Sequence, residues 1–115
     1  MIARANQVVG SGIGACAALS GGYLTFVDNQ CTRATGTPKA GATVAVPVVL
    51  VGAGITASHN VVSASAGLLN VPVSMDLTAL GDSRYTVLGN HTTGAITIGG
   101  SKAIGDPWAP LNVRL

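Results

Sequence analysis

The sequence has few charged residues and very few aromatic ones. Charged residues make up 9% and aromatic residues 3% of the 115-residue chain, and glutamate is absent. An ordinary soluble domain carries about 25% charged residues. Because aromatic side chains bury the most area per residue, this core must be built from valine, leucine, isoleucine and alanine. Such a core is thin and little charge keeps chains apart, so the composition favours association with other chains.

The cationic residues are also few, and they are spread singly along the chain. Six lysine and arginine residues give a formal net charge of +2. Nucleic-acid binding requires clustered cations that displace counterions, so we expect no nucleic-acid partner. No run reaches the roughly 18 apolar residues of a membrane-spanning helix, so we expect no membrane partner. Residues 1–19 are too glycine-rich for a signal peptide, which predicts synthesis in the cytoplasm without processing.

Only two cysteines are present, Cys16 and Cys31. They can form a disulfide if two short strands bring them within reach, but a single pair of cysteines does not define a disulfide framework. The simpler expectation is a pair of small buried thiols. Neither cysteine has a CxxC partner or a nearby histidine, so we expect no metal site.

Strand signals recur along the chain, whereas good helix formers are scarce. Glycine, valine and threonine are common, and turn residues separate short apolar runs, with turns expected at residues 28–29 and 89–90. These features predict an all-β domain over residues 21–115, a small β-sandwich or β-barrel of about six short strands. No internal repeat is evident at the periods of solenoid proteins. The expected strands are residues 22–27, 43–51, 68–73, 84–88, 95–98 and 111–115.

Residues 1–20 lack clear periodicity and are predicted to form an extended N-terminal arm that becomes ordered against a neighbouring chain. Arg4, Val8 and Val9 are the candidate contact residues of this arm. A further candidate is Trp108, which lies between two prolines. A tryptophan in a stiff segment loses little entropy on docking, so it suits an interface anchor. The alternative is that Trp108 fills one end of the β domain.

Residues 52–57 (GAGITA) follow an apolar run and match a dinucleotide-binding fingerprint. In that interpretation Gly52 makes the tight turn, Gly54 lets the backbone approach a pyrophosphate, and Asp76 binds ribose hydroxyls. The fingerprint requires a good helix after the glycines, and residues 55–66 are rich in serine, threonine and valine. Pro47 also lies inside the required central strand. We therefore expect no cofactor.

Catalytic patterns are absent from the sequence. His59 and His91 are possible bases, but no nucleophile elbow, zinc-binding helix motif or paired-carboxylate motif accompanies them. The aspartates lie in turn contexts, where carboxylates usually accept hydrogen bonds from backbone N–H groups. The sequence therefore predicts a protein that is not an enzyme.

Three segments give the chain a resemblance to a known family. Residues 21–24 (GGYL), 39–46 (KAGATVAV) and 113–115 (VRL) resemble parts of the small capsid decoration, or cement, proteins of tailed bacteriophages. The resemblance implies a β-barrel-like module on the outside of a virion, commonly a trimer, that clamps neighbouring major capsid subunits together. Residues 52–76 depart from the family's pattern.

The expected function is therefore a non-enzymatic structural protein that binds and stabilises a larger assembly. The expected assembly is a virion, on which the protein would act as a capsid decoration or cement protein through self-association and contact with a major shell protein. One alternative is a dinucleotide-binding fragment that uses Gly52, Gly54 and Asp76. Another is a subunit of an extracellular surface layer or filament, in which Cys16 and Cys31 form a disulfide.

Overall fold

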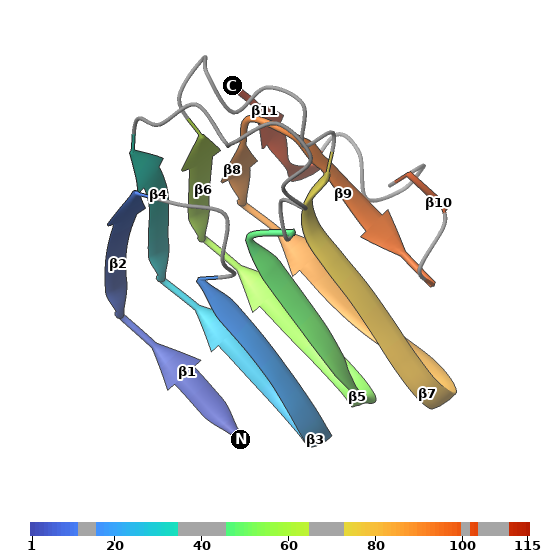
Figure 1. Cartoon of the computed structure of the whole chain (residues 1–115). Helices are drawn as coiled ribbons and strands as arrows, with labels where there is room; N and C mark the ends of the chain where they lie inside the picture. Colours follow the sequence, from blue (N-terminus) through green and yellow to red (C-terminus); the bar gives the residue numbers. More distant parts are fainter. Residues whose placement is uncertain (12–15, 35–45, 65–72, 100–101, 104–110) are drawn as a thin grey trace, which may run out of the picture.

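The protein is built from strands that belong to two sheets (Figure 1). The computed structural model describes residues 1–11, 16–34, 46–64, 73–99, 102–103 and 111–115. The first sheet has the order β1-β3-β5-β7-β9-β10, and the second has the order β11-β8-β6-β4-β2. The strands are β1 (Ile2–Arg4), β2 (Gln7–Ser11), β3 (Ala17–Val27), β4 (Gln30–Ala34), β5 (Val48–Ser58), β6 (Val61–Ala64), β7 (Val73–Leu88), β8 (His91–Thr92), β9 (Ala95–Ile98), β10 (Lys102–Ala103) and β11 (Val113–Arg114).

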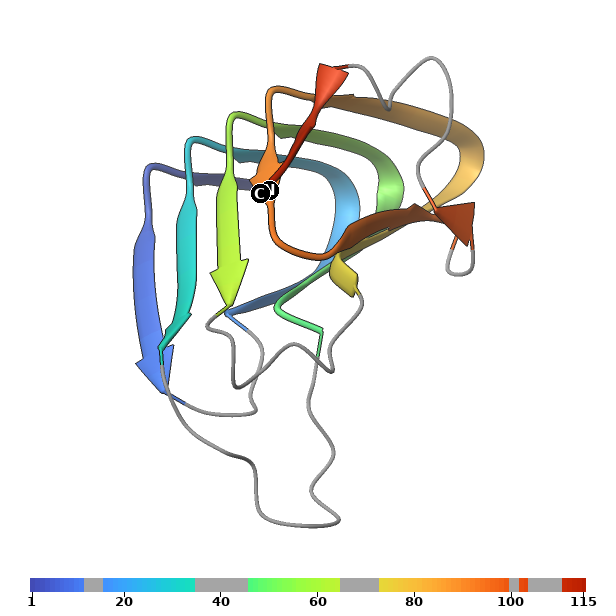
Figure 2. The ribbon, with the colours of Figure 1, turned by 90° about the horizontal axis from the view of Figure 1, so that it is seen from above.

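The two sheets form a parallel β-solenoid. The chain passes along a strand of the first sheet, turns a corner into a strand of the second sheet, and then returns to the first sheet one layer further on (Figures 1 and 2). β1–β2, β3–β4, β5–β6 and β7–β8 are the first four coils. Within the described segments, neighbouring strands pair in parallel in both sheets, except that β10 pairs antiparallel with β9.

The all-β prediction is confirmed, and several strand predictions are close. The run at 95–98 coincides with β9, and the runs at 22–27 and 84–88 lie inside β3 and β7. The described residues contain eleven strands instead of about six, because the chain crosses both sheets once in each coil. Pro47 precedes β5 and accepts hydrogen bonds from Cys16 and Ala17 through its carbonyl oxygen.

The prediction that residues 1–20 form an extended N-terminal arm is corrected by the structure. Within residues 1–20, β1, β2 and the start of β3 belong to the two sheets. β1 pairs with β3 and β2 pairs with β4, so these residues form the first coil of the solenoid. Their short strands leave too little alternation to reveal a pattern in the sequence. Pairing with the next coil holds them in place.

Side chains at alternate strand positions fill the space between the sheets. In the first sheet, Phe26, Ala57 and Val87 are in register on three successive strands and are all buried. In the second sheet, Cys31 and Val62 are in register and buried. The core is therefore a stack of similar small layers, which suits a composition rich in aliphatic residues and poor in aromatic ones.

The corners between the sheets share a local conformation. The backbone φ is positive at Ala5, Asp28, His59 and Gly89, with values of 54°, 55°, 55° and 69°. Each of these residues precedes an asparagine. A positive φ turns the chain sharply, so every corner bends at the same point of its coil. The turns predicted at residues 28–29 and 89–90 are two of these corners.

The asparagines that follow the corner residues form a ladder along the solenoid. The Nδ2 atoms of Asn6, Asn29, Asn60 and Asn90 each donate to Oδ1 of the next ladder asparagine, at 3.0, 3.2, 2.9 and 2.9 Å, and the last acceptor is Asn112. The backbone N–H of each donor residue binds the same Oδ1 atom, at 3.0–3.1 Å. Each carboxamide therefore ties two coils together.

Each ladder asparagine after the first also binds back to the preceding coil. Nδ2 of Asn29 donates to the carbonyl oxygen of Ala3, and Nδ2 of Asn60 donates to that of Phe26, both at 2.9 Å. Asn60 and Asn90 are fully buried. Buried polar groups are costly unless they are paired, so the ladder fixes the stacking of the coils.

These coils are the internal repeat that the sequence analysis did not find. Successive ladder asparagines are 23, 31, 30 and 22 residues apart. The spacing varies, and only the asparagine and the alternation around it recur, so no fixed period appears in the sequence.

Removing one buried rung should destabilise the protein strongly. Asn60→Ala leaves buried partners in Asn29, Asn90 and Phe26 without their hydrogen bonds. We expect the free energy of unfolding to fall by about 2–5 kcal/mol. Urea denaturation followed by circular dichroism measures the change. Gln30→Ala, at an exposed position beside the ladder, is the control and should change it by less than about 0.5 kcal/mol. Equal effects of the two variants would contradict a structural ladder.

Candidate functional site

The two ends of the solenoid are built differently. At the C-terminal end, the first sheet is closed by β10, a two-residue antiparallel strand, and the second sheet ends in the two-residue β11. At the N-terminal end, β1 and β2 are the outermost strands of their sheets, and no described strand pairs with their outer edges. Edge strands with unpaired N–H and C=O groups are templates for pairing with another chain. The N-terminal end is therefore the candidate site.

Apolar side chains are exposed at this end because no coil covers it. Val8 is in register with the buried Cys31 and therefore occupies a position that faces the core. Its exposed fraction is nevertheless 40%, whereas that of Val62, two coils further on in the same column, is 1%. Ile2, which lies on the outer face of β1 in register with Thr25, is 73% exposed. Val8 is more exposed than Val62 because no coil covers it on its N-terminal side.

A hollow opens between the two sheets at this end. Its volume is about 410 Å³, and both of the first two coils line it. Ala3 and Val8 contribute from the first coil, and Leu19, Phe26 and Cys31 contribute from the second. Apart from four amide side chains, the lining residues are aliphatic, aromatic or the two bonded cysteines, so the hollow is suited to an apolar side chain or to another coil.

Asn6 is the first rung of the ladder, and its side-chain acceptor is left open. Its backbone N–H and its Nδ2 atom bind Oδ1 of Asn29. In Asn29, Oδ1 accepts two hydrogen bonds from Asn6, but no described group donates to Oδ1 of Asn6. The solenoid therefore presents a carboxamide acceptor beside the apolar hollow.

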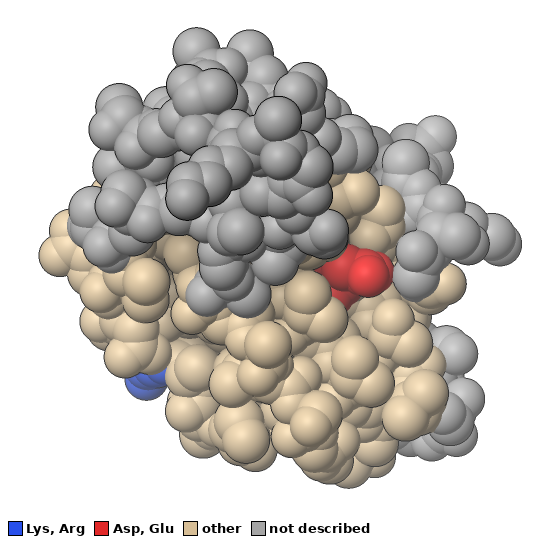
Figure 3. Space-filling model, in the orientation of Figure 1, with Lys and Arg blue, Asp and Glu red and all other residues tan. Residues whose placement is uncertain are grey.

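Charge contributes little at this end. Arg4 and Asp28 approach within 3.9 Å, and both side chains are largely exposed, so the pair adds little stability. On the face shown in Figure 3, the described charged side chains form only two small patches. Contact with this surface would have to rely on backbone hydrogen bonds and apolar burial.

Three of the four predicted interaction residues lie at the open end. Arg4 is in β1, and Val8 and Val9 are in β2. Trp108 lies outside the described residues. Asn6 and the other ladder asparagines were not among the predicted site residues. The signal that could have found them is an asparagine after an apolar run and before a second short run, which recurs in each coil.

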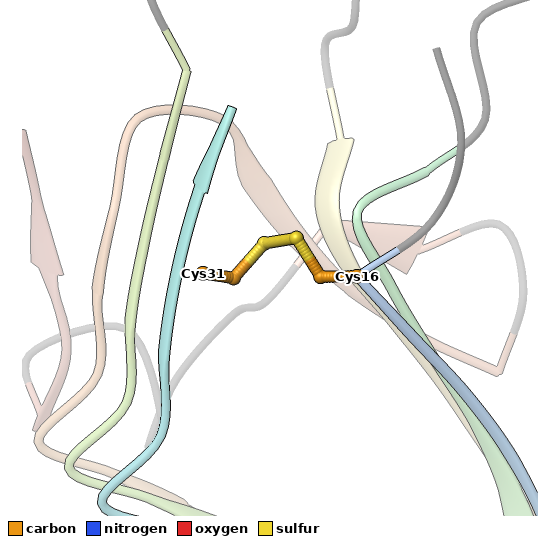
Figure 4. Close-up of a disulfide and its surroundings, with 2 residues drawn as sticks. All are labelled: Cys16 and Cys31. Atoms are coloured by element: carbon orange, nitrogen blue, oxygen red, sulfur yellow. A yellow bond between two sulfur atoms is a disulfide. The ribbon is translucent and has the colours of Figure 1, made fainter. Parts of the chain in front are cut away.

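Cys16 and Cys31 form a disulfide, which corrects the expectation of two buried thiols (Figure 4). Cys16 precedes β3 and Cys31 lies in β4, so the bond closes the second coil across the core, between the first and second sheets. The sequence separation is 15 residues and the Cα–Cα distance is 6.0 Å. The strands bring the two cysteines together because β3 and β4 are two sides of one coil.

Removing the disulfide should weaken the N-terminal coils. A loop of about 15 residues predicts a stabilisation of roughly 3 kcal/mol. The variant Cys16→Ala with Cys31→Ala should therefore melt at a lower temperature than the wild type in a thermal scan. Dithiothreitol should lower the melting temperature of the wild type and leave that of the double variant unchanged. A wild type whose thiols become titratable without any change in melting temperature would contradict this role.

The residues of the dinucleotide-like fingerprint serve the fold instead. Gly52 and Gly54 lie inside β5, which continues as a strand to Ser58, so no helix follows them. A Cβ atom on Gly52 would lie 2.5 Å from the carbonyl oxygen of Gly22. Figure 2 shows that β3 and β5 curve strongly. Gly52 lets their backbones approach closely as they curve. Asp76 accepts a hydrogen bond from the Thr97 hydroxyl at 2.9 Å.

The steric role of Gly52 has a matched control one coil away. Gly52→Ala should lower the free energy of unfolding by about 1–3 kcal/mol, because the nearest obstacle is rigid backbone. Gly22→Ala adds the same methyl group where no atom lies within 4 Å and should be nearly neutral. Urea denaturation of both variants tests the difference. If both variants were equally stable, the close approach would not constrain residue 52.

The possible catalytic residues do not gather in the described structure. His59 and His91 are exposed near two different corners. No three histidine, cysteine, aspartate or glutamate side chains of the described segments lie close enough to hold a metal ion. A second hollow of about 560 Å³ lies over the outer face of the first sheet and is open to solvent. Tyr23 and a row of three in-register threonines, Thr25, Thr56 and Thr86, contribute to it.

Comparisons with protein-family models, curated proteins and solved structures found no match. In the described segments, no helix has the length and hydrophobicity that crossing a bilayer requires.

Proposed function

We propose that the protein is a non-enzymatic structural subunit that joins a larger assembly through the N-terminal end of its solenoid. The observation that carries this proposal is the open end itself. There, two unpaired strand edges, an apolar hollow and the Oδ1 atom of Asn6 lie together. In the interior of the solenoid, the neighbouring coil pairs with the strand edges, covers the apolar side chains and donates to the carboxamide acceptor. A partner that supplies strands and apolar groups would do the same at the open end.

Binding at such an end stabilises an assembly by mass action. A subunit that binds only assembled chains adds its binding free energy to the stability of the assembly. Backbone hydrogen bonds along β1 and β2 supply orientation, and burial of Val8 supplies apolar area. The low charge of the chain reduces the electrostatic cost of packing subunits close together.

The proposed setting is outside the reducing cytoplasm. Disulfides persist in secreted proteins and on virion and cell surfaces. The Cys16–Cys31 bond therefore supports both structural settings that the sequence suggested. The first is the outside of a virion, where the protein would decorate a capsid. The second is an extracellular surface layer or filament, and the disulfide is the observation that favours it as an alternative.

A lysine at the open end should prevent assembly without unfolding the protein. Val8→Lys places an ammonium group in the apolar contact, where burial of a charge is costly. Val61→Lys is the matched control, because Val61 is a half-exposed valine on β6 in the middle of the solenoid. Native particles or cell surfaces are sedimented with each purified variant. We expect wild type and Val61→Lys to co-sediment and Val8→Lys to remain in the supernatant.

Circular dichroism and thermal melting of the three proteins show whether the substitutions disturb the fold. Co-sedimentation of Val8→Lys at the wild-type level would contradict assembly through this end. A wild type that stays in the supernatant with every particle and surface tested would contradict the structural function. Fractionation of virions and cell envelopes then distinguishes the two settings.

A further inference from the structure

We infer that the N-terminal end binds the same end of a second copy of this chain, around a two-fold axis at the corner between Ala5 and Asn6. This inference rests on the proposed function and names the partner at its site. Dimerisation through this end is then the first step in joining the larger assembly, because the second copy supplies the strands and the apolar groups that the open end lacks.

The hydrogen-bonding groups of Asn6 match those of another Asn6. Nδ2 of Asn29 makes two hydrogen bonds, one to the next rung and one to a carbonyl of the preceding coil. Among the described residues, Nδ2 of Asn6 makes the first of these bonds and no second one, so it keeps one hydrogen, and its Oδ1 is an open acceptor. A carboxamide with one donor and one acceptor is complementary to its own two-fold copy.

The strand directions fit the same axis. β1 runs into the corner and β2 runs out of it, as the first coil in Figure 2 shows. A two-fold axis that bisects the corner therefore places β1 of one copy against β2 of the other, in antiparallel directions. Both unpaired edges are then paired, and each sheet of one copy continues into the other sheet of its partner.

The pattern of inward and outward side chains selects the register. Ala3 and Val8 both occupy core-facing positions, because they are in register with the buried Phe26 and Cys31. Pairing Ala3 of one copy with Val8 of the other keeps both on the inner face. Arg4 then lies opposite Gln7 on the outer face. The two hollows meet, and the core-facing Val8 becomes buried against the second copy, as Val62 is buried against its neighbouring coils.

The C-terminal end is a poorer partner for the open end. At the open end, β2 has five residues and none of them is charged, and β1 has three residues with one arginine at its end. At the C-terminal end, β10 and β11 have two residues each, and each strand includes a lysine or an arginine. Very short edges with cationic residues disfavour strand pairing. In addition, β10 runs antiparallel to β9, so the last strand of the first sheet at that end runs opposite to the other strands of the sheet. The contact is therefore closed and two-fold, and it stops at a dimer.

Cross-linking between single-cysteine variants tests the register. Directly opposed antiparallel residues have Cβ atoms about 5 Å apart, which a disulfide can bridge. We expect Arg4→Cys mixed with Gln7→Cys to give a cross-linked dimer under mild oxidation. The same mixture with Val8→Lys added to both chains should give at least about tenfold less product, as expected for a tenfold weaker dimer.

Val113→Cys is the control for the opposite end, where Val113 is exposed on β11. A mixture of Gln7→Cys with Val113→Cys should give no product. A product there, or a ladder of multimers in sedimentation velocity, would replace the two-fold contact with head-to-tail stacking and overturn the inference.

Sedimentation equilibrium of the wild-type protein separates this inference from the proposed function. We expect a concentration-dependent monomer–dimer equilibrium with no larger species. A wild-type monomer at all concentrations that still co-sediments with particles through Val8 would overturn the dimer and leave the function standing. A dimer that joins no particle or surface would overturn the function and leave the dimer.

Discussion

The structure depends on buried carboxamides at the corners of its coils. Asn29, Asn60 and Asn90 bind backbone and side-chain groups of the neighbouring coils at buried positions. A shift of one residue in the register of a coil would leave these groups unpaired in the core, and each unpaired group is costly. The ladder therefore fixes the register of the coils, and this register places the thin layers of valine, leucine and isoleucine over one another.

The ladder also has a direction, and that direction makes the two ends unequal. From Asn6 to Asn90, each rung donates through its backbone N–H and Nδ2 to Oδ1 of the next rung on the C-terminal side, so Oδ1 accepts from the N-terminal side. From Asn29 onward, Nδ2 also donates to a carbonyl oxygen of the preceding coil. A solenoid with such polarity leaves an acceptor at its first coil. In this chain the acceptor coincides with unpaired strand edges and an apolar hollow, which is why the proposed contacts lie there.

Two further features support the first coils. The Cys16–Cys31 disulfide closes the second coil across the core, directly beneath the open end, and both cysteines line the hollow. Gly52 allows β5 to curve against β3 where a methyl group would meet backbone. The sequence feature that imitates a dinucleotide-binding loop is thus explained by close packing of two strands. A rigid second coil keeps the open end in a fixed shape, which lowers the entropic cost of binding there.

The sequence alone determined the all-β class, the turns at residues 28–29 and 89–90, and β9, because these follow from local propensity and turn chemistry. Low charge and few aromatic residues likewise indicated a thin core. Only the tertiary structure decided that the strands pair in parallel, that residues 1–11 form the first coil, and that the cysteines are bonded. The physical reason is that these features are contacts between residues 15–34 positions apart, joined across segments of unequal length. A single asparagine in each coil carries the repeat, and its partners become visible only when the coils are stacked.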